Sequence, residues 1–177
     1  MALKIYDWKQ TELLAHPVRE ALKQLPETLI HGVTKNADEL ADTDKWAATY
    51  DIPLDTTANV VVVEWRKTKN AEREFAAVLV LADSRADLNG AIKKVLGAYK
   101  VSFAPTEKAV AATGMESGGM SPIGLPETWP LIIDERVLGI PKLYLGSGIR
   151  PSKLVVDGEV GVHITHATVV GNIARRT

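Results

Sequence analysis

Two runs of aliphatic residues separated by a charged stretch constrain the fold of this chain more than any other feature. Residues 60–63 are four consecutive valines, and residues 76–81 read Ala-Ala-Val-Leu-Val-Leu. The stretch between them, from Arg66 to Glu74, is polar and charged. Short β-branched runs are typical of buried strands, and a polar stretch between two of them is typical of an exposed turn. We therefore predict an antiparallel β-hairpin with a charged tip.

Helical patterns and further short apolar runs alternate along the rest of the chain. Helices are predicted from His16-Pro17 to Pro26, over 36–50 with Asp42, Thr43 and Asp44 at the cap, over 87–96, and over 105–112. Additional strands are predicted at 101–103, 131–133, 142–145 and 154–156, whereas 168–174 fits neither pattern. A length of 177 residues suits one domain. We expect a single α/β domain over residues 1–177, with a mixed, mostly antiparallel sheet flanked by helices.

Composition excludes several classes of function. The chain contains no cysteine, which removes disulfides, thiolate nucleophiles and cysteine-ligated zinc. Its net charge of -1 is unlike that of proteins that coat DNA or RNA. No apolar run approaches the roughly 18–20 residues of a membrane span, and the first ten residues are too polar for a signal peptide. We expect a cytoplasmic protein that binds neither DNA nor a membrane.

The charge is unevenly distributed along the chain. Residues 59–104 contain 8 basic and 5 acidic side chains, whereas residues 1–58 contain 6 basic and 10 acidic ones. Two interpretations of the basic middle remain open. It is either a solvated face or a small patch that touches a few phosphates of a polyanion.

A glycine-rich segment is the strongest candidate for a functional site. Residues 113–124 read Thr-Gly-Met-Glu-Ser-Gly-Gly-Met-Ser-Pro-Ile-Gly, with four glycines in twelve residues. Successive backbone N–H groups in such a loop can form a concavity for an anion or a carbonyl oxygen. The alternative is a long loop that requires glycine only in order to turn.

Three better-known motifs do not fit. A serine nucleophile elbow needs an N–H on the residue after the serine, and Pro122 follows Ser121. The Gly146-Ser147-Gly148 segment lacks the third glycine of a dinucleotide site and the lysine of a P-loop. His163 and His166 can share a helical face, but no third metal ligand stands nearby in the sequence. We therefore expect neither a cofactor nor a metal.

The glycine-rich segment resembles the signature of the YbaK and prolyl-tRNA synthetase editing-domain family. Three further blocks resemble the family in the same order, and together the similarity covers about residues 14–176. These blocks are Leu131-Ile132-Ile133-Asp134-Glu135, Leu143-Tyr144-Leu145-Gly146-Ser147-Gly148-Ile149-Arg150 and Gly171-Asn172-Ile173-Ala174-Arg175-Arg176.

The resemblance implies a trans-acting aminoacyl-tRNA deacylase. Such an enzyme hydrolyses the ester of mischarged tRNA with a positioned water, assisted by the neighbouring ribose hydroxyl, and its partner is the aminoacylated acceptor end of tRNA. The family pattern assigns the catalytic loop to Gly118, Gly119, Ser121 and Pro122. It assigns substrate binding to Asn59, Gly124, Asp134, Gly146, Ser147, Gly148 and Arg150, with Gly146 and Gly148 as the facing wall and Asp134 as its support.

One position departs from the family pattern. Members of the family usually carry a lysine at the start of the first hairpin strand, where this chain has Asn59. Asparagine keeps a hydrogen-bond donor but lacks the charge and the reach of lysine. Either Arg66, Lys67, Lys69 or Arg150 supplies the missing cation, or the protein is a non-catalytic member that binds an aminoacyl or nucleotide end or a protein partner.

Overall fold

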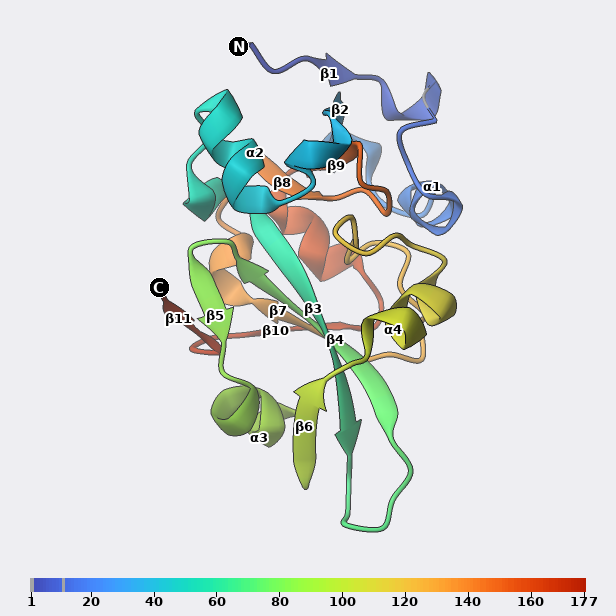
Figure 1. The fold of residues 1–177 in the computed structure, drawn as a ribbon, viewed down its shortest axis with the longest axis vertical. Coiled ribbons are helices and arrows are strands. Elements are labelled where there is room, and N and C mark those ends of the chain that lie inside the picture. The colour runs from blue at the N-terminus through green and yellow to red at the C-terminus, as the bar shows by residue number, and fades with distance from the viewer. Residues whose placement is uncertain (1, 11) are drawn as a thin grey trace.

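The computed structural model describes residues 2–10 and 12–177, which form two main β-sheets flanked by helices (Figure 1). The first sheet is antiparallel and has the order β1 (Ile5–Tyr6), β2 (Ile30–Lys35), β9 (Ser152–Val156), β8 (Leu143–Gly146). The second has the order β10 (Ala167–Val170), β7 (Leu131–Asp134), β4 (Glu74–Leu81), β3 (Ala58–Arg66), β6 (Lys100–Phe103). A two-stranded ribbon joins β11 (Ala174–Arg176) to β5 (Ser84–Ala86).

The helices are short. The α-helices are α1 (His16–Leu22), α2 (Thr43–Tyr50), α3 (Lys93–Val95) and α4 (Thr106–Thr113). A π-helical segment, η5 (Leu88–Ile92), precedes α3. The 3₁₀ helices are η1 (Trp8–Gln10), η2 (Glu27–Leu29), η3 (Asp38–Leu40), η4 (Leu54–Thr56), η6 (Glu135–Val137) and η7 (Gly158–His163). Within the described residues no helix is long and apolar enough to cross a membrane.

The mixed α/β class predicted from the sequence is confirmed. The hairpin β3–β4 is antiparallel and continuous from Ala58↔Leu81 to Trp65↔Glu74, with the charged residues at its tip. The strands differ from the expected single sheet in that they divide between sheets. In the second sheet β7 runs parallel to both β4 and β10.

The sequence pattern does not predict strands β2 and β10 or the π-helical segment η5. Strand β2 was not predicted, because Gly32 at φ +137° lies at a register shift that interrupts the alternation. The C-terminal residues form β10, whose partner β7 lies more than thirty residues earlier in the chain. The helix predicted over 87–96 begins as a π-helix, because the N–H of Ile92 donates to the carbonyl of Asp87, five residues earlier, at 2.9 Å; the Asp87 carboxylate caps this turn by accepting from the N–H groups of Gly90 and Ala91.

The main core lies between the two sheets, and separate clusters cover their outer faces. Alternate residues of β4, such as Leu79, pack with Leu154 of β9 and Val18 of α1 in the central cluster. Helix α2 covers the outer face of the first sheet, where Trp46 packs against Tyr144 and Val155. Because Lys153 lies two residues before Val155, it shares this face beneath α2. A bridge between Thr57 and Tyr144 joins the two sheets at the start of β3.

A buried carboxylate ties the hairpin to α4. Glu64 on β3 is 4% exposed and accepts hydrogen bonds from Arg73 Nη1 at 2.8 Å and from Lys108 Nζ at 3.3 Å. The Arg73 hydrogen bond, supported by Lys108 and opposed by burial, holds the pKa of Glu64 below its usual value of 4.5. Its charged form therefore stabilises the fold above the ordinary pKa, and this contribution disappears as the pH falls through the lowered pKa.

We expect Glu64→Gln to lower the free energy of unfolding by about 1–3 kcal/mol near neutral pH, because two cations lose their charged acceptor. The difference between the parent and the variant should shrink towards zero as the pH falls through the lowered pKa of Glu64. Urea unfolding at several pH values measures this, with Glu74→Gln, an exposed carboxylate of the same hairpin, as the control. A pH-independent difference would show that packing, not charge, is the cause.

Candidate active site

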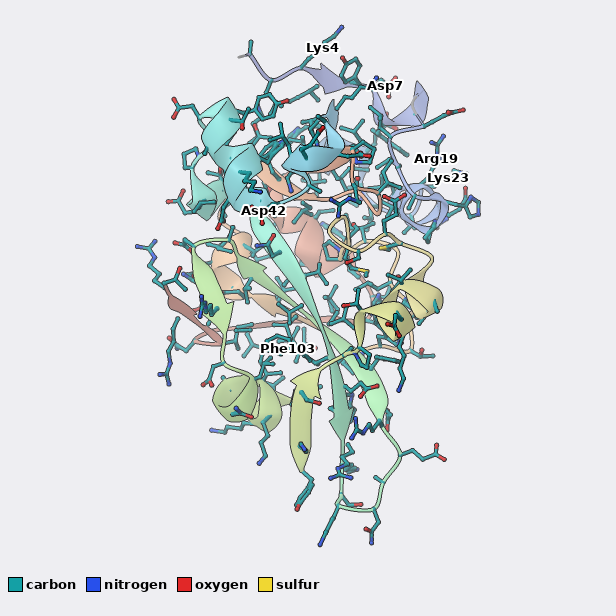
Figure 2. All side chains as sticks on the ribbon, in the orientation of Figure 1. Lys4, Asp7, Arg19, Lys23, Asp42 and Phe103 are labelled. Carbon is teal, nitrogen blue, oxygen red and sulfur yellow. The ribbon has the colours of Figure 1, made fainter. Side chains whose placement is uncertain are left out.

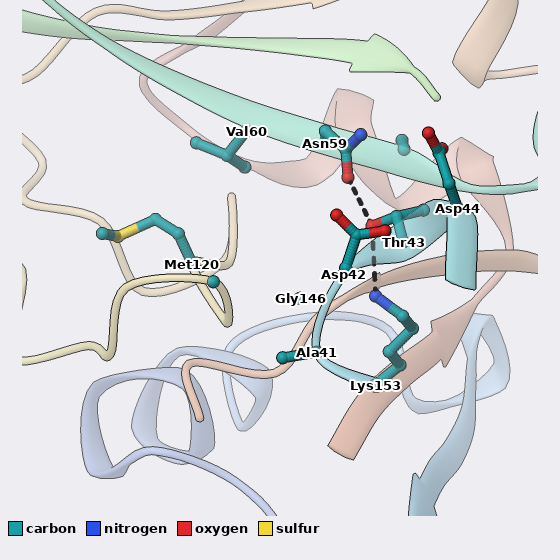
Figure 3. A pocket seen from close by; sticks show the side chains of 11 residues that line it. Ala41, Asp42, Thr43, Asp44, Asn59, Val60, Met120, Gly146 and Lys153 are labelled. Atoms are coloured by element: carbon teal, nitrogen blue, oxygen red, sulfur yellow. Dashed lines mark hydrogen bonds between the residues drawn. The ribbon is translucent and has the colours of Figure 1, made fainter. Parts of the chain in front are cut away.

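A cavity of about 330 Å³ lies where the start of α2, the start of β3 and the end of β8 meet the glycine-rich loop. Figure 3 shows that Lys153 and Asn59 approach it from different strands, with Thr43 between them. The lining side chains combine one cation, two carboxylates and a few small apolar groups. The lining residues are Ala41, Asp42, Thr43, Asp44, Ala58, Asn59, Val60, Gly118, Met120, Gly146 and Lys153.

The glycine-rich loop packs face to face with residues 146–150. The N–H of Gly148 donates to the carbonyl of Gly119 at 2.7 Å, and the N–H of Glu116 donates to the carbonyl of Gly148 at 2.9 Å. A Cβ on Gly146 would overlap the carbonyl of Met120, so only glycine permits this approach. The two segments thus form one rigid wall of the cavity.

Glu116 and Arg150 fasten this wall from outside. The N–H of Arg150 donates to the Glu116 carboxylate at 2.8 Å. The Arg150 guanidinium donates to the carbonyls of Ser117 at 3.2 Å and Asp38 at 3.3 Å. Arg150 therefore clamps the loop to the segment before α2 and does not line the cavity.

Lys153 provides a buried cation inside the cavity. The residue is 6% exposed, and its Nζ lies 3.3 Å from Thr43 Oγ1 and 5.3 Å from the centre of the Trp46 ring. In the described part of the chain no carboxylate lies within ion-pair distance of this ammonium. Burial lowers the pKa of Lys153 from 10.5 to about 8, and nearby Asp42 partly opposes the shift. Lysine is rarely buried without an ion-pair partner, and a buried cation with a shifted pKa that lines a cavity marks a candidate functional site.

Thr43 links this ammonium to β3. Its hydroxyl accepts from Lys153 Nζ and donates to Asn59 Oδ1 at 2.8 Å. Thr43 is held in place because it begins α2, whose N-cap is Asp42: the Asp42 carboxylate accepts from the N–H of Lys45 at 3.1 Å. Asn59 thus stands one hydroxyl away from the lysine.

Of the residues that the family pattern assigns, Asn59, Gly118 and Gly146 line the cavity. The others lie in its walls or elsewhere. Ser121 is fully buried, and its Oγ accepts from the N–H of Ile123 at 3.2 Å, so this hydroxyl shapes the loop. Gly119, Pro122 and Gly148 are buried behind the lining.

Ser147, Gly124 and Asp134 also lie outside the cavity. The Ser147 hydroxyl bonds with Ser152 Oγ at 2.6 Å, and Gly124 packs against α1. Asp134 is bound by Arg136, whose Nη2 lies 2.6 Å from Oδ2. The expected support of Gly146 and Gly148 by Asp134 is wrong, because the Asp134 carboxylate instead accepts hydrogen bonds from the backbone N–H and the guanidinium of Arg136.

None of the expected substitutes for the lysine absent at position 59, which are Arg66, Lys67, Lys69 and Arg150, lines the cavity. Arg66, Lys67 and Lys69 lie at the far end of the hairpin, where Arg66 stacks over Tyr99 at 5.5 Å. Sequence reasoning missed Lys153, together with Asp42 and Thr43, which it treated only as a helix cap. One signal was available: Lys153 directly precedes the apolar run Leu154-Val155-Val156, and a lysine beside a buried strand needs a reason.

The geometry supports chemistry on a small polar molecule. The Lys153 ammonium can stabilise negative charge that develops on an oxygen in the cavity. Asp42 and Asp44 are exposed at its rim and can attract an ammonium group. No group of three or more potential metal-ligating side chains occurs within residues 2–10 and 12–177.

Comparison with known proteins gives both a family and a fold. Residues 37–163 match the aminoacyl-tRNA editing domain. A structure described as that of a candidate trans-editing enzyme for prolyl tRNA synthetase matches with a TM-score of 0.72 and 20% identity, over 91% of this chain and 96% of that one. A hypothetical protein matches with a TM-score of 0.70 and 22% identity, over 90% and 100%. A search of curated proteins finds no match. At these identities the structural likeness shows the fold alone.

Proposed function

The chain belongs to the aminoacyl-tRNA editing domain family, and from this premise we propose that it is a trans-acting deacylase that hydrolyses the ester of mischarged tRNA. The observation that carries the proposal is the buried ammonium of Lys153, which faces a small cavity without an ion-pair partner among the described residues. Action in trans is part of the proposal because the fold neighbour is described as a candidate trans-editing enzyme.

The proposed reaction is hydrolysis by a positioned water. The water oxygen attacks the ester carbonyl carbon, and the bond between that carbon and the ribose oxygen then breaks. The ribose oxygen takes a proton and leaves as a hydroxyl, and the amino acid leaves as a carboxylate with release of the second water proton. The vicinal ribose hydroxyl orients the water, so that no protein nucleophile is required.

Each polar group of the cavity has a place in this proposal. The Lys153 ammonium stabilises the oxyanion that forms on the ester carbonyl oxygen. Asp42 and Asp44 attract the α-ammonium group of the amino acid. Thr43 and Asn59 keep the ammonium directed into the cavity through their hydrogen bonds.

The dimensions of the cavity favour a small amino acid. About 330 Å³ must hold the aminoacyl group and part of the ribose. Ala41, Ala58 and Val60 form the small apolar surface that contacts the side chain of the bound amino acid and distinguishes one amino acid from another. A single methylene changes the discrimination in such a pocket by only about 1–3 kcal/mol, which suits an editor of closely similar residues.

The alternative, a non-catalytic binding protein, was considered because Asn59 stands where the family usually has a lysine. Lys153 brings an ammonium to within one hydroxyl of Asn59, which favours the enzyme. The test is a panel of tRNAs, each charged with a different wrong amino acid, incubated with and without the protein. Accelerated release of at least one amino acid supports the deacylase, and binding without release supports the alternative.

The mechanism predicts insensitivity to metal removal and to loss of the loop serine. We expect EDTA to leave turnover unchanged, because no step passes through a metal. Ser121→Ala should keep turnover within roughly threefold of the parent while lowering stability by about 1 kcal/mol, since it deletes the acceptor for Ile123 N–H. Complete loss with EDTA, or an acyl-enzyme trapped on Ser121, would overturn the mechanism.

A further inference from the structure

A second hollow adjoins the candidate active site. This groove, of about 310 Å³, follows β3 from Val60 to Val62 and reaches Phe103 at the end of β6. It shares Val60, Gly118 and Met120 with the cavity, so the two spaces are contiguous. A molecule whose reacting group lies in the cavity can therefore extend into the groove.

Phe103 is unusually exposed for its type. It is 71% exposed, the highest value among the large hydrophobic residues described, and its place at the upper end of β6 is labelled in Figure 2. The backbone holds it there: Phe103 pairs with Val63, and the N–H of Ala104 donates to the Val62 carbonyl at 3.0 Å. Phe103 is thus an exposed apolar residue on a fixed strand, and it borders one end of the groove.

The charges around the two hollows are polarised along β3. Asp42 and Asp44 stand at the cavity end, where the segment before β3 adds Asp51 and Asp55. Beyond Phe103, the hairpin tip and the start of β6 present a basic cluster, which we define as Arg66, Lys67, Lys69 and Lys100, and which outnumbers the two exposed carboxylates of the same tip, Glu72 and Glu74. A polyanion attached to a group in the cavity is repelled from the α2 end and attracted towards this basic cluster.

We propose that the groove is the site for the terminal unpaired nucleotide of the tRNA, with its base stacked on Phe103 and the preceding phosphates directed towards the basic cluster. The inference rests on the proposed function, which places the ester in the adjacent cavity. Proteins bind unpaired RNA ends mainly by stacking bases on aromatic rings and by attracting the backbone with cations. The ester is attached to the ribose of the terminal nucleotide, so the base of that nucleotide is separated from the cavity only by the ribose. The groove is the hollow that adjoins the cavity and can hold this base.

Two RNAs that differ by one base test this proposal directly. The probes are fluorescently labelled, uncharged acceptor-stem minihelices, one ending in ACCA and the other with an abasic site at the final nucleotide. We expect the parent to bind the complete minihelix roughly 5- to 150-fold more tightly than the abasic one. Phe103→Ala should lose the same factor on the complete minihelix and show no further loss on the abasic one, because both changes remove one interaction.

Two further variants separate stacking from a general surface effect. Phe103→Trp should keep or strengthen the preference for the complete minihelix, since tryptophan retains an aromatic face. Val162→Ala, at an apolar residue that is 50% exposed on η7, should bind both RNAs as the parent does. Equal affinity of the parent for the two minihelices, or an unchanged preference in Phe103→Ala, overturns the proposal.

The outcome is distinguishable from failure of the deacylase proposal. Hydrolysis is measured separately on the mischarged tRNA panel. If the minihelix preference depends on Phe103 but no ester is hydrolysed, the nucleotide site stands and the enzymatic function fails. If esters are hydrolysed and Phe103→Ala changes neither KM nor minihelix binding, the function stands and the nucleotide site fails.

Discussion

Lys153→Met is expected to lower ester hydrolysis by about 100- to 1000-fold, the effect of removing one oxyanion-stabilising donor. The same variant should be more stable than the parent. The fall in the pKa of Lys153 from 10.5 to about 8 corresponds to a penalty of up to about 3 kcal/mol for the buried charge, which methionine does not carry. Loss of activity with a gain in stability identifies a functional residue, because a structural residue would lose both.

The pH dependence of Lys153 has a definite sign. Below pH 8 the lysine is protonated in both the folded and the unfolded chain, so the full penalty applies. Between about 8 and 10.5 the unfolded chain binds more protons, and the stability contributed by this group rises with pH. Turnover should show the opposite trend and fall as the pH rises through about 8, because the ammonium is lost. Rate–pH profiles and urea unfolding of the parent and the variant measure the two trends.

A double variant in which the lysine is moved from position 153 on β9 to position 59 on β3 tests whether the ammonium itself is what hydrolysis requires. Asn59 and Lys153 both bond to Thr43, so an ammonium carried by residue 59 can reach the same part of the cavity. We expect Asn59→Lys to restore at least a tenth of parental turnover in the Lys153→Met background. In the parent background it should bring no gain, because two ammonium groups would repel each other there.

Lys35→Met, at an exposed lysine of the neighbouring strand β2, controls for loss of positive charge alone. It should leave hydrolysis and its pH profile at parental values. Undiminished turnover in Lys153→Met would remove this lysine from the mechanism. A double variant that folds but stays inactive would mean that the position of the ammonium, and not only its charge, is fixed by β9.

The parts of the fold that could be predicted are those decided by neighbouring residues. The valine run of β3 and the charged tip indicate the hairpin without reference to any other segment. Asp42 predicts the start of α2 because a cap is a contact within one helical turn. By contrast, β2 and β10 depend on partners far along the chain, and Gly32 breaks the alternation that would have indicated β2.

The candidate site shows the same division. The glycine loop and the facing Gly146 segment could be predicted, because close approach demands glycine at positions visible in the sequence. The pairing of Lys153 with Thr43 could not, since it requires β9 to lie beneath α2 and in register with β8, where Gly146 is the partner of Lys153. In the proposed mechanism the cation therefore comes from β9 and not from β3, and it bonds to the same Thr43 hydroxyl as Asn59.

Gly118→Val is expected to lower hydrolysis by about 100-fold or more with the fold retained. Gly118 borders both the cavity and the groove, so its substitution displaces the ester and the terminal nucleotide together. A Cβ there would lie 2.8 Å from Arg150 Nη1 and 3.9 Å from the Ala41 Cβ. Misplacing a reacting group by about 1 Å can reduce the rate by this factor.

The same substitution also strains the backbone, and this effect must be separated from the first. Gly118 has φ +83°, a conformation that costs a non-glycine residue about 1–2 kcal/mol. Gly97→Val is the matched control, because Gly97 has φ +59°, lies away from the cavity lining, and has no neighbouring atom within 4 Å of where a Cβ would stand. We expect both variants to melt at lower temperature than the parent, and only Gly118→Val to lose hydrolysis. Parental turnover in folded Gly118→Val would mean that the glycine loop turns the chain without bordering the reacting ester.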